Sequence, residues 1–363
     1  MEYKKRFFSS EEEALEAYRK YEEVFEKAQR AHAKGKQLDA DITVKNYLIY
    51  WFEHIFSGRI ENTTKALGVV ALYSWLLPQM EKDIKLRMVT AQYLEEILER
   101  VAKITDSAGN KCREFLNMAF KEAVEQGYLK NNPVSGVKAY SRKKPRITIL
   151  TKDKLKEFLS AAYNNKWYFE ILLALFCGLR KGEIMGLKSG DFDIEQGTVC
   201  ISRQITSDPV FIPGESKPES YGVIERPPKT ENSYRTLKVP DIIIEELKKR
   251  LVLLDIQKEK LGESYIDNDY ISCQENGIPH SLSAFNSALS RICSKNGIPH
   301  ITVHGLRHMY ATILMEQGVP LVKISALLGH SSVNTTFEYY IEVMNENEEI
   351  MDFLNNCFIP GGK

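Results

Sequence analysis

The sequence predicts a mainly α-helical protein with a small antiparallel β-sheet, organised as a helical domain followed by an α+β domain. Three observations support this fold class. Residues 41–140 carry successive apolar patterns of helix length. A basic, proline-containing stretch, SRKKPR, then interrupts the pattern at Ser141–Arg146. Beyond it, strand-like stretches stand between further helical patterns. We therefore expect a domain over 41–140, a linker over 141–147 and a second domain that begins at 148.

The N-terminal segment, residues 1–40, predicts one helix. Ser10 followed by Glu13 fits a capping box, and apolar side chains follow at roughly helical spacing. The next domain predicts four helices, and Gly127 with the Asn131–Pro133 stretch closes the last of them. The four patterns are ITVKNYLIYWFEHIF, NTTKALGVVALYSWLLPQM, TAQYLEEILERVAKI and SAGNKCREFLNMAFKEAVEQG.

The second domain predicts a small sheet among helices. Two stretches have the character of antiparallel strands, FDIEQGTVCISRQIT and GVIERPPKTENSYRTLKVP, with KTENSYR at or near a hairpin turn. The stretch DIIIEELKKRLVLLDIQKEKLG returns to a helical pattern. The tetrapeptide GIPH occurs at 277 and again at 297, and we interpret both copies as turns before helices.

Bulk composition excludes several classes of protein. The chain has 363 residues and 43% apolar content, enough for two or three compact domains. Lys plus Arg equals Asp plus Glu, 49 each, so the overall charge indicates no partner. The six cysteines form no Cys-x-x-Cys pair, which argues against a zinc site or a disulfide framework and fits a reducing cytoplasm. The N-terminus lacks an apolar signal core, and no apolar run reaches membrane-spanning length.

One basic cluster stands out against this neutral background. His304 and Arg307 are three residues apart at an expected helix start, in HGLRHMYATILMEQG. They therefore share one face, where free backbone N–H groups and the helix dipole favour an anion. For the four residues His304–Arg307 alone, a surface arginine and a capping histidine are the more common explanation.

The order of further motifs favours an anion-binding site over this more common explanation. Arg180 and Glu183 follow an apolar helix in FCGLRKGEIMGL, Lys229 begins KTENSYR, and His330 follows a glycine in LLGHSSVNTTFEYYIEV. Each alone has an ordinary explanation, as an ion pair at a helix start, a solvated lysine in a turn and a helix terminator. A pair of tyrosines, which are typically half-buried, completes the series.

The ordered set resembles the tyrosine recombinase, or phage integrase, family, and is most similar to integrases of phages and conjugative transposons of Gram-positive bacteria. The resemblance extends over roughly residues 41–345. HGLRHMYATILMEQGVPLVKISALLGHSSVNTT resembles the longest signature of the family almost throughout. GLRKGEI resembles its first arginine motif, and KTENSYR resembles its lysine hairpin. The basic cluster is thus expected to face a DNA phosphate, with a tyrosine opposite.

The resemblance implies DNA strand cleavage through a 3′-phosphotyrosine, without metal, ATP or any other cofactor. Two guanidiniums, Arg180 and Arg307, can hold the non-bridging phosphate oxygens with forked hydrogen bonds and stabilise the transition state. His330 adds a further donor. No carboxylate cluster or nucleotide-binding motif appears in the sequence, which agrees with metal-free chemistry.

Other residues are expected to transfer the protons. A tyrosine phenol has a pKa of about 10, so it needs a base or cationic surroundings to attack at neutral pH. His304 is the expected base, and Lys229 is the expected general acid for the leaving 5′ oxygen. Glu183 is expected to orient Arg180 or His304. Each role is implied by the resemblance together with the residue type.

Either of two adjacent tyrosines, Tyr339 and Tyr340, lies within reach of the phosphate by sequence. Neighbouring side chains on a helix diverge by roughly 100°, so only one of them can face it. The stretch TTFEYYIEV resembles the family form in which two threonines precede the nucleophile at a fixed spacing and a valine follows three positions later, here Val343. This register predicts Tyr340. Many relatives have a histidine two positions after the tyrosine, whereas this chain has Glu342.

The resemblance also assigns the domains. Residues 41–140 are expected to be the helical, SAM-like core-binding domain, which grips double-stranded DNA together with the catalytic domain, 148–345. Residues 1–40 resemble only the helix that ends an arm-binding domain, because the strands before it are missing. The acidic tail, 346–363, is expected to dock on a neighbouring protomer. The implied partners are attachment-site DNA, a homo-tetramer on that DNA, and accessory DNA-bending or directionality proteins at the bacterial nucleoid.

Three alternatives remain open from the sequence. A type IB topoisomerase shares the Arg/Lys/Arg/His/Tyr mechanism, although the long HGLRH signature favours a recombinase. A non-catalytic DNA-binding regulator on the same fold is disfavoured, because every expected catalytic residue type is present. The third alternative is a metal-dependent nuclease, whose cleavage stops when EDTA removes the metal. Cleavage that resists EDTA excludes this alternative.

Overall fold

In the computed structural model, the described residues are 41–81, 83–105, 107–140, 148–211, 218–228, 230–334 and 336–337. Several expectations lie outside them and stay predictions: the N-terminal helix in 1–40, the linker 141–147, Lys229, both tyrosines 339 and 340, and the tail 346–363. Within the described ranges, no helix is both long and apolar enough to cross a membrane.

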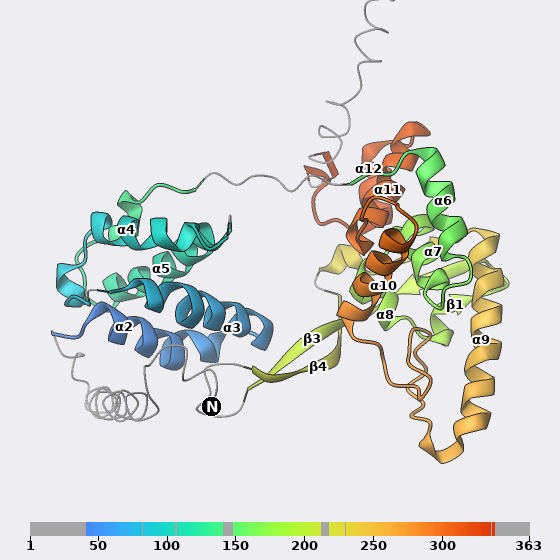
Figure 1. Cartoon of the computed structure of the whole chain (residues 1–363), viewed down its shortest axis with the longest axis horizontal. Coiled ribbons are helices and arrows are strands. Elements are labelled where there is room, and N and C mark those ends of the chain that lie inside the picture. The colour runs from blue at the N-terminus through green and yellow to red at the C-terminus, as the bar shows by residue number, and fades with distance from the viewer. Residues whose placement is uncertain are drawn as a thin grey trace, which may run out of the picture. The chain divides into compact units, whose positions relative to one another are not determined.

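The described residues divide into two compact units (Figure 1). The first contains the residues up to 140, together with 208–211 and 218–222 from a two-stranded ribbon. The second contains the described residues of 148–207 and 223–337. The fold class predicted from the sequence, mainly helical with small antiparallel sheets, is confirmed.

The first unit is built from helices at the four predicted positions. Threonine hydroxyls cap two of them, because Thr43 accepts from the backbone N–H of Asn46 and Thr90 from that of Tyr93. Rings of Trp51 and other aromatic residues fill the core between the helices. The elements are α2 (Val44–Tyr50) continuing into η2 (Trp51–Phe56), α3 (Asn62–Val69) continuing into η4 (Val70–Leu76), α4 (Ala91–Ala102) and α5 (Ala108–Glu125).

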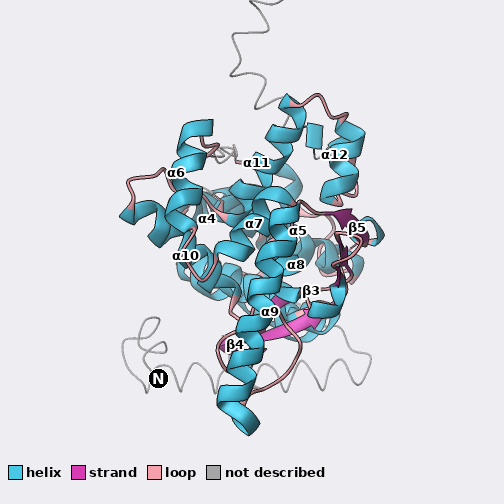
Figure 2. Ribbon diagram, turned by 90° about the vertical axis from the view of Figure 1, so that its right-hand side faces the viewer, coloured by secondary structure: helices cyan, strands magenta, loops and turns pink. Residues whose placement is uncertain are grey.

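The second unit surrounds the apolar helix α7 (Tyr168–Phe176), whose side chains are buried on nearly every face. The long helix α9 (Asp241–Leu261) runs along one side of the unit, as the sequence predicted (Figure 2). The two GIPH turns precede α10 and α11, also as predicted. The other helices are α6 (Lys152–Ala162), α8 (Lys181–Gly186), α10 (Leu282–Lys295), α11 (Val303–Glu316) and α12 (Leu321–Leu328).

Two small sheets replace the single predicted one. A three-stranded antiparallel sheet has the order β1-β2-β5, with Val199 opposite Leu237, and β3 pairs with β4 separately. KTENSYR therefore does not lie at a hairpin turn. Its described part includes the turn η9 (Glu231–Ser233) and connects the two sheets. The strands are β1 (Phe192–Asp193), β2 (Thr198–Ile201), β3 (Gln204–Phe211), β4 (Pro218–Arg226) and β5 (Arg235–Lys238).

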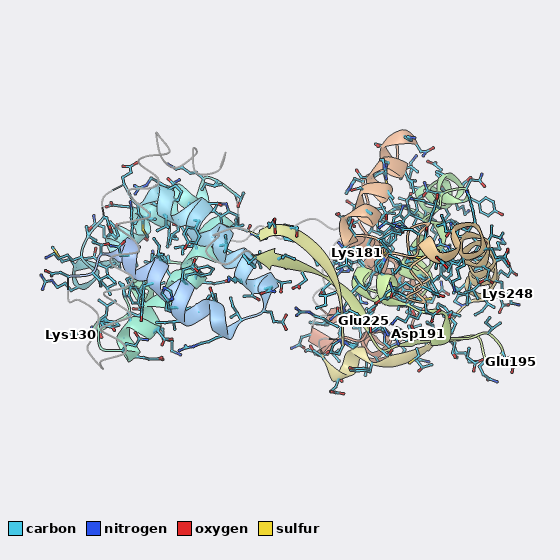
Figure 3. All side chains as sticks on the ribbon, turned by 90° about the horizontal axis from the view of Figure 1, so that it is seen from below. Lys130, Lys181, Asp191, Glu195, Glu225 and Lys248 are labelled. Atoms are coloured by element: carbon cyan, nitrogen blue, oxygen red, sulfur yellow. The ribbon has the colours of Figure 1, made fainter. Side chains whose placement is uncertain are left out.

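Ion pairs hold the start of the β3–β4 ribbon within the second unit. Asp191 and Glu225 lie near one another there (Figure 3), and Arg203 pairs with both carboxylates. Lys188 Nζ lies 2.8 Å from Glu225, and the Tyr270 hydroxyl donates to the same carboxylate at 2.6 Å. These bonds tie the residue before β3 and the end of β4 to the segment that precedes β1 and to Tyr270.

Candidate active site

The ends of three helices bring the predicted site residues together in the second unit. Arg180 stands immediately before α8, and Glu183 lies in the first turn of that helix. His304 and Arg307 lie in the first turns of α11, whose N-terminus Thr302 caps. His330 follows the C-terminus of α12. The sequence expectation that His304 and Arg307 stand at a helix start is confirmed.

Gly178 lets the chain turn sharply between α7 and Arg180. Its φ is +61°, and a Cβ there would lie 2.4 Å from a ring carbon of Tyr310, so only glycine fits. Its carbonyl oxygen accepts a hydrogen bond from Arg307 Nη1 at 2.6 Å. The same turn that ends α7 therefore presents Arg180 and anchors Arg307.

Glu183 is the centre of the cluster. Its side chain is 2% exposed, and it accepts from the backbone N–H of Arg180 at 2.8 Å and from Arg180 Nη1 at 2.7 Å. Arg307 Nη1 lies 3.9 Å from the same carboxylate. Burial raises the pKa of Glu183, but the hydrogen bonds and charges of the surrounding arginines outweigh it and hold the pKa below its ordinary value. The carboxylate is therefore ionised at neutral pH.

A third arginine, Arg235 at the start of β5, belongs to the same cluster. Arg235 Nη2 lies 2.8 Å from Glu183 Oε2, and Nη1 lies 3.0 Å from Oε1, which forms a forked pair. The sequence interpretation gave this residue no role, although it closes the quoted motif KTENSYR. Its signal was weak, since an arginine two residues beyond a turn is ordinary on a strand.

The three arginines also bind consecutive carbonyl groups at the C-terminus of α12. Arg235 Nε donates to the carbonyl oxygen of Leu327 at 2.9 Å. Arg307 Nη2 donates to that of Leu328 at 2.6 Å, and Arg180 Nη2 to that of Gly329 at 2.8 Å. Carbonyls at a helix C-terminus lack intrahelical partners and carry the negative end of the dipole, so guanidiniums suit them.

Gly329 makes that helix end possible. It adopts the left-handed conformation, with φ 65° and ψ 45°, as the C-terminal glycine of many helices does. A Cβ at this position would lie 3.0 Å from both Arg235 Nη1 and the carbonyl oxygen of Asn232. The position of His330, one residue later, is therefore set by the arginine cluster.

Both histidines predicted for the site favour their neutral form. Burial, and then the charges of Arg307 and Arg180 above all, lower the pKa of His330 to about 4. His304 is exposed, yet desolvation followed by the same two arginines also lowers its pKa. The ring of His304 meets that of His308 edge-on, with centroids 4.2 Å apart. A neutral imidazole can accept a proton, as the role expected of His304 requires.

Of the seven residues predicted for the site, the structure describes five. Arg180 and Arg307 bond, with Arg235, to the C-terminus of α12, which His330 follows. The charges of Arg307 and Arg180 act on His304. Glu183 bonds to Arg180, one of the two partners expected for it. Arg180 is 35% exposed at its side chain and Arg307 is 2% exposed. Thr336 is a second residue without a role in the sequence interpretation, and its hydroxyl lies 2.9 Å from His330 Nδ1. The roles of Lys229 and Tyr340 stay predictions.

This cluster lies within residues 148–347, which match the phage integrase family. The chain belongs to this family, which confirms the resemblance inferred from its motifs.

Individual relatives are consistent with that assignment. A tyrosine recombinase XerC-like protein of Caldanaerobacter subterraneus is 34% identical over 255 residues, which cover 68% of this chain and 65% of the relative. The ICEBs1 integrase of Bacillus subtilis is 25% identical, over 70% of this chain and 66% of its own. The transposase from transposon Tn916 of Enterococcus faecalis is 26% identical, over 64% and 57%. The match thus spans less than two thirds of the length of each of these relatives.

Solved structures share the fold. The integrase of transposon Tn1549, in complex with a circular intermediate DNA, aligns with a TM-score of 0.65 at 20% identity, over 82% of this chain and 94% of that one. A lambda integrase tetramer bound to a Holliday junction aligns with a TM-score of 0.58 at 20% identity, over 83% and 78%.

Proposed function

We propose that this protein is a tyrosine site-specific recombinase that cleaves and rejoins DNA through a 3′-phosphotyrosine, and so integrates or excises a mobile element. One observation carries the proposal: Arg180 and Arg307 lie beside one ionised carboxylate, and both are close enough to His304 and His330 to favour the neutral form of these histidines. A cationic cluster held rigidly by protein groups is suited to stabilise charge that develops on a phosphoryl group. Membership of the phage integrase family supports the same reaction class.

Cleavage exchanges one phosphate ester bond for another. The phenol oxygen of Tyr340 forms a bond to phosphorus while His304 takes the phenol proton. The bond from phosphorus to the 5′ oxygen breaks, and Lys229 donates a proton to that oxygen. Rejoining runs in reverse, with a 5′ hydroxyl attacking the phosphotyrosine and the tyrosine leaving. The phosphotyrosine keeps the energy of the original bond, so the reaction needs no ATP. The two arginines supply the charge stabilisation that a metal ion gives in other phosphoryl-transfer enzymes.

Arg180 and Arg307 act on the transition state. Backbone carbonyls and Glu183 already hold their guanidiniums, so little reorganisation accompanies the reaction. His330 donates to a non-bridging oxygen from the ring nitrogen that Thr336 does not contact. Glu183 keeps Arg180 in place, and does not itself exchange protons with the substrate.

The rest of the chain serves DNA binding and assembly in this proposal. Residues 41–140 are the core-binding domain, 148–345 the catalytic domain and 141–147 a basic linker. Residues 1–40 resemble the end of an arm-binding domain, and the tail 346–363 docks on a neighbouring protomer. The partners are double-stranded attachment-site DNA, further copies in a tetramer, and accessory DNA-bending or directionality proteins, in the bacterial cytoplasm at the nucleoid. The lambda integrase tetramer on a Holliday junction supports the assembly by analogy of fold.

Covalent trapping tests the proposal. The substrate is a duplex built from the DNA that flanks the coding region, at the short repeats expected of an attachment site, with a nick that lets the cleaved strand diffuse away. The wild-type protein is expected to give a shifted band on a denaturing gel, in EDTA as well as in its absence. Tyr340→Phe is expected to give no adduct, and Tyr339→Phe to retain it.

Other outcomes reject specific parts. The reverse pattern for the two tyrosine variants moves the nucleophile to Tyr339. Cleavage that stops in EDTA indicates a metal-dependent nuclease. Relaxation of plasmids that lack the repeat, without strand exchange between repeat-bearing duplexes, indicates a topoisomerase. Specific binding with no adduct from the wild-type protein indicates a DNA-binding regulator.

A further inference from the structure

Arg235 is buried among protein groups that its guanidinium binds, whereas the side chain of Arg180 is 35% exposed. The side chain of Arg235 is 7% exposed. Besides the forked pair with Glu183, Nε binds the carbonyl of Leu327 at 2.9 Å and Nη1 binds that of Ser233 at 3.0 Å. All three of its nitrogens are thereby hydrogen-bonded to protein groups, so in this structure the guanidinium holds Glu183 and two backbone carbonyls.

The forked pair determines how Glu183 is shared. Oε1 accepts from both Arg180 Nη1 and Arg235 Nη1, at 2.7 and 3.0 Å. Oε2 accepts from Arg235 Nη2 and from the backbone of Arg180. Because Arg235 takes one side of the carboxylate, the Arg180 side chain bonds to Oε1 through Nη1 alone, and its Nη2 turns to Gly329. The charged groups facing Glu183 are thus Arg180 beside α8, Arg235 on β5 and Arg307 on α11.

We propose that Arg235 is a positioning residue for strand cleavage, which holds Glu183 and the end of α12 so that Arg180 stays directed at the DNA phosphate. The inference rests on the proposed recombinase function. It assigns Arg235 no contact with DNA. Without Arg235, the buried carboxylate turns toward Arg180 and Arg307 and draws them away from the phosphate, while the carbonyl of Leu327 loses its donor.

The chain offers a matched control for this residue. Arg250 on α9 forms the same kind of fork with Glu170, at 2.8 and 3.1 Å, and Glu170 is 1% exposed. It likewise binds two backbone carbonyls, those of Lys166 and Ile271. Arg250→Met therefore removes an equivalent buried fork from the same unit, while the contacts it breaks involve none of the predicted site residues.

The first test compares Arg235→Met with Arg250→Met in the full-length protein, on the nicked duplex from the flanking repeats. At saturating DNA, Arg235→Met is expected to slow adduct formation about 100-fold, since small misplacements of catalytic groups have effects of this size. Its dissociation constant for the same duplex is expected to match that of the wild type. Arg250→Met is expected to lower the melting temperature and leave the cleavage rate at saturation near that of the wild type.

The second test asks whether Arg235 acts through Glu183. Glu183→Gln is made alone and together with Arg235→Met. If Arg235 works through the carboxylate, the double variant cleaves within about twofold of Glu183→Gln, whereas independent effects multiply. Arg235→Lys is expected to recover part of the rate, because the ammonium keeps the charge but not the fork. It also replaces Arg235→Met in the cycle if the methionine variant does not fold.

The outcomes separate the two claims. A wild-type protein that binds the duplex but forms no adduct overturns the proposed function, and with it the reaction that Arg235 serves. An adduct from the wild type together with an equal rate from Arg235→Met overturns the inference alone. Equal slowing by Arg235→Met and Arg250→Met shows that Arg235 only stabilises the fold. Fully multiplicative effects with Glu183→Gln show that Arg235 does not act through Glu183, and either result overturns the inference.

Discussion

The Nδ1 atom of His330 lies 2.9 Å from the hydroxyl oxygen of Thr336, a residue that is 1% exposed. With its pKa lowered to about 4, the imidazole is neutral at pH 7 and carries a single N–H. We expect the threonine hydroxyl to donate to Nδ1, which places the single ring N–H on Nε2, where it can bond to a phosphate oxygen. In that arrangement the pair sets the tautomer that the proposed role of His330 requires.

Thr336→Val tests this relationship, since valine keeps the shape and removes the hydroxyl. We expect adduct formation to slow about tenfold, as for other residues that orient a functional histidine. Thr336→Ser keeps a hydroxyl and is expected to retain most of the rate. Single-turnover trapping on the nicked duplex measures both, and equal rates for the two variants contradict the proposed orientation.

The two phosphate arginines are expected to affect cleavage far more than binding. Arg180→Ala and Arg307→Ala should each slow cleavage about 100- to 1,000-fold, the usual effect of removing one donor to a developing charge. Specific DNA affinity should persist, because it comes from many distributed backbone contacts. Lysine at either position should restore little, because it lacks the planar fork. Gel shifts and trapping assays check the separation, and near-normal cleavage by either alanine variant refutes the assignment.

Lys229 is expected to protonate the leaving 5′ oxygen. A duplex with a bridging 5′-phosphorothiolate has a leaving group that needs no proton. Lys229→Ala should therefore cleave the normal duplex slowly and the sulfur duplex nearly as fast as the wild type does. Rates on the paired duplexes give the comparison. Equal impairment on both moves the acid role elsewhere, with His304 the next residue to test.

Acid should destabilise the DNA-free protein through its buried histidines. Desolvation first, and then the neighbouring charges, lower the pKa of His308 to about 3. An unfolded histidine has a pKa of about 6.5, so below that pH the unfolded state binds a proton that the folded state does not. The stability contribution is present above pH 6.5 and is lost as the pH falls toward 3, by at most about 1.4 kcal/mol per pH unit.

Urea denaturation at pH 7 and pH 5 measures this effect. His308 is 7% exposed, so screening by solvent is small, and His308→Gln should lose less stability on acidification than the wild type. His300→Gln, at an exposed position before α11, is the control and should lose as much as the wild type. The same loss in His308→Gln as in the control contradicts a neutral buried histidine at 308.

Local patterns predicted the helices well and the sheet partners poorly. Each of the four helices in 41–140 has its own apolar face, and Thr43 and Thr90 mark two of the starts by capping. The strands differ, since β5 pairs with β2 across the whole β3–β4 ribbon. A period of two predicts a strand without naming its partner, and so KTENSYR was assigned to the wrong kind of turn.

The sequence by itself determined which chemistry-bearing residues this protein has and in what order. Arg180, Glu183, His304 and Arg307 stand in local motifs at helix starts, where spacing alone places each pair on one face. Only the tertiary structure decided what these residues do to one another. Arg235 lies 52 positions from Glu183 and takes both of its oxygens, and Arg180 lies 149 positions from the carbonyl of Gly329. The lowered pKa values of the histidines likewise arise from desolvation and from arginine charges brought close by the fold, Arg180 on both histidines and Arg307 on His330, because electrostatic energies depend on distance in space and on local solvent.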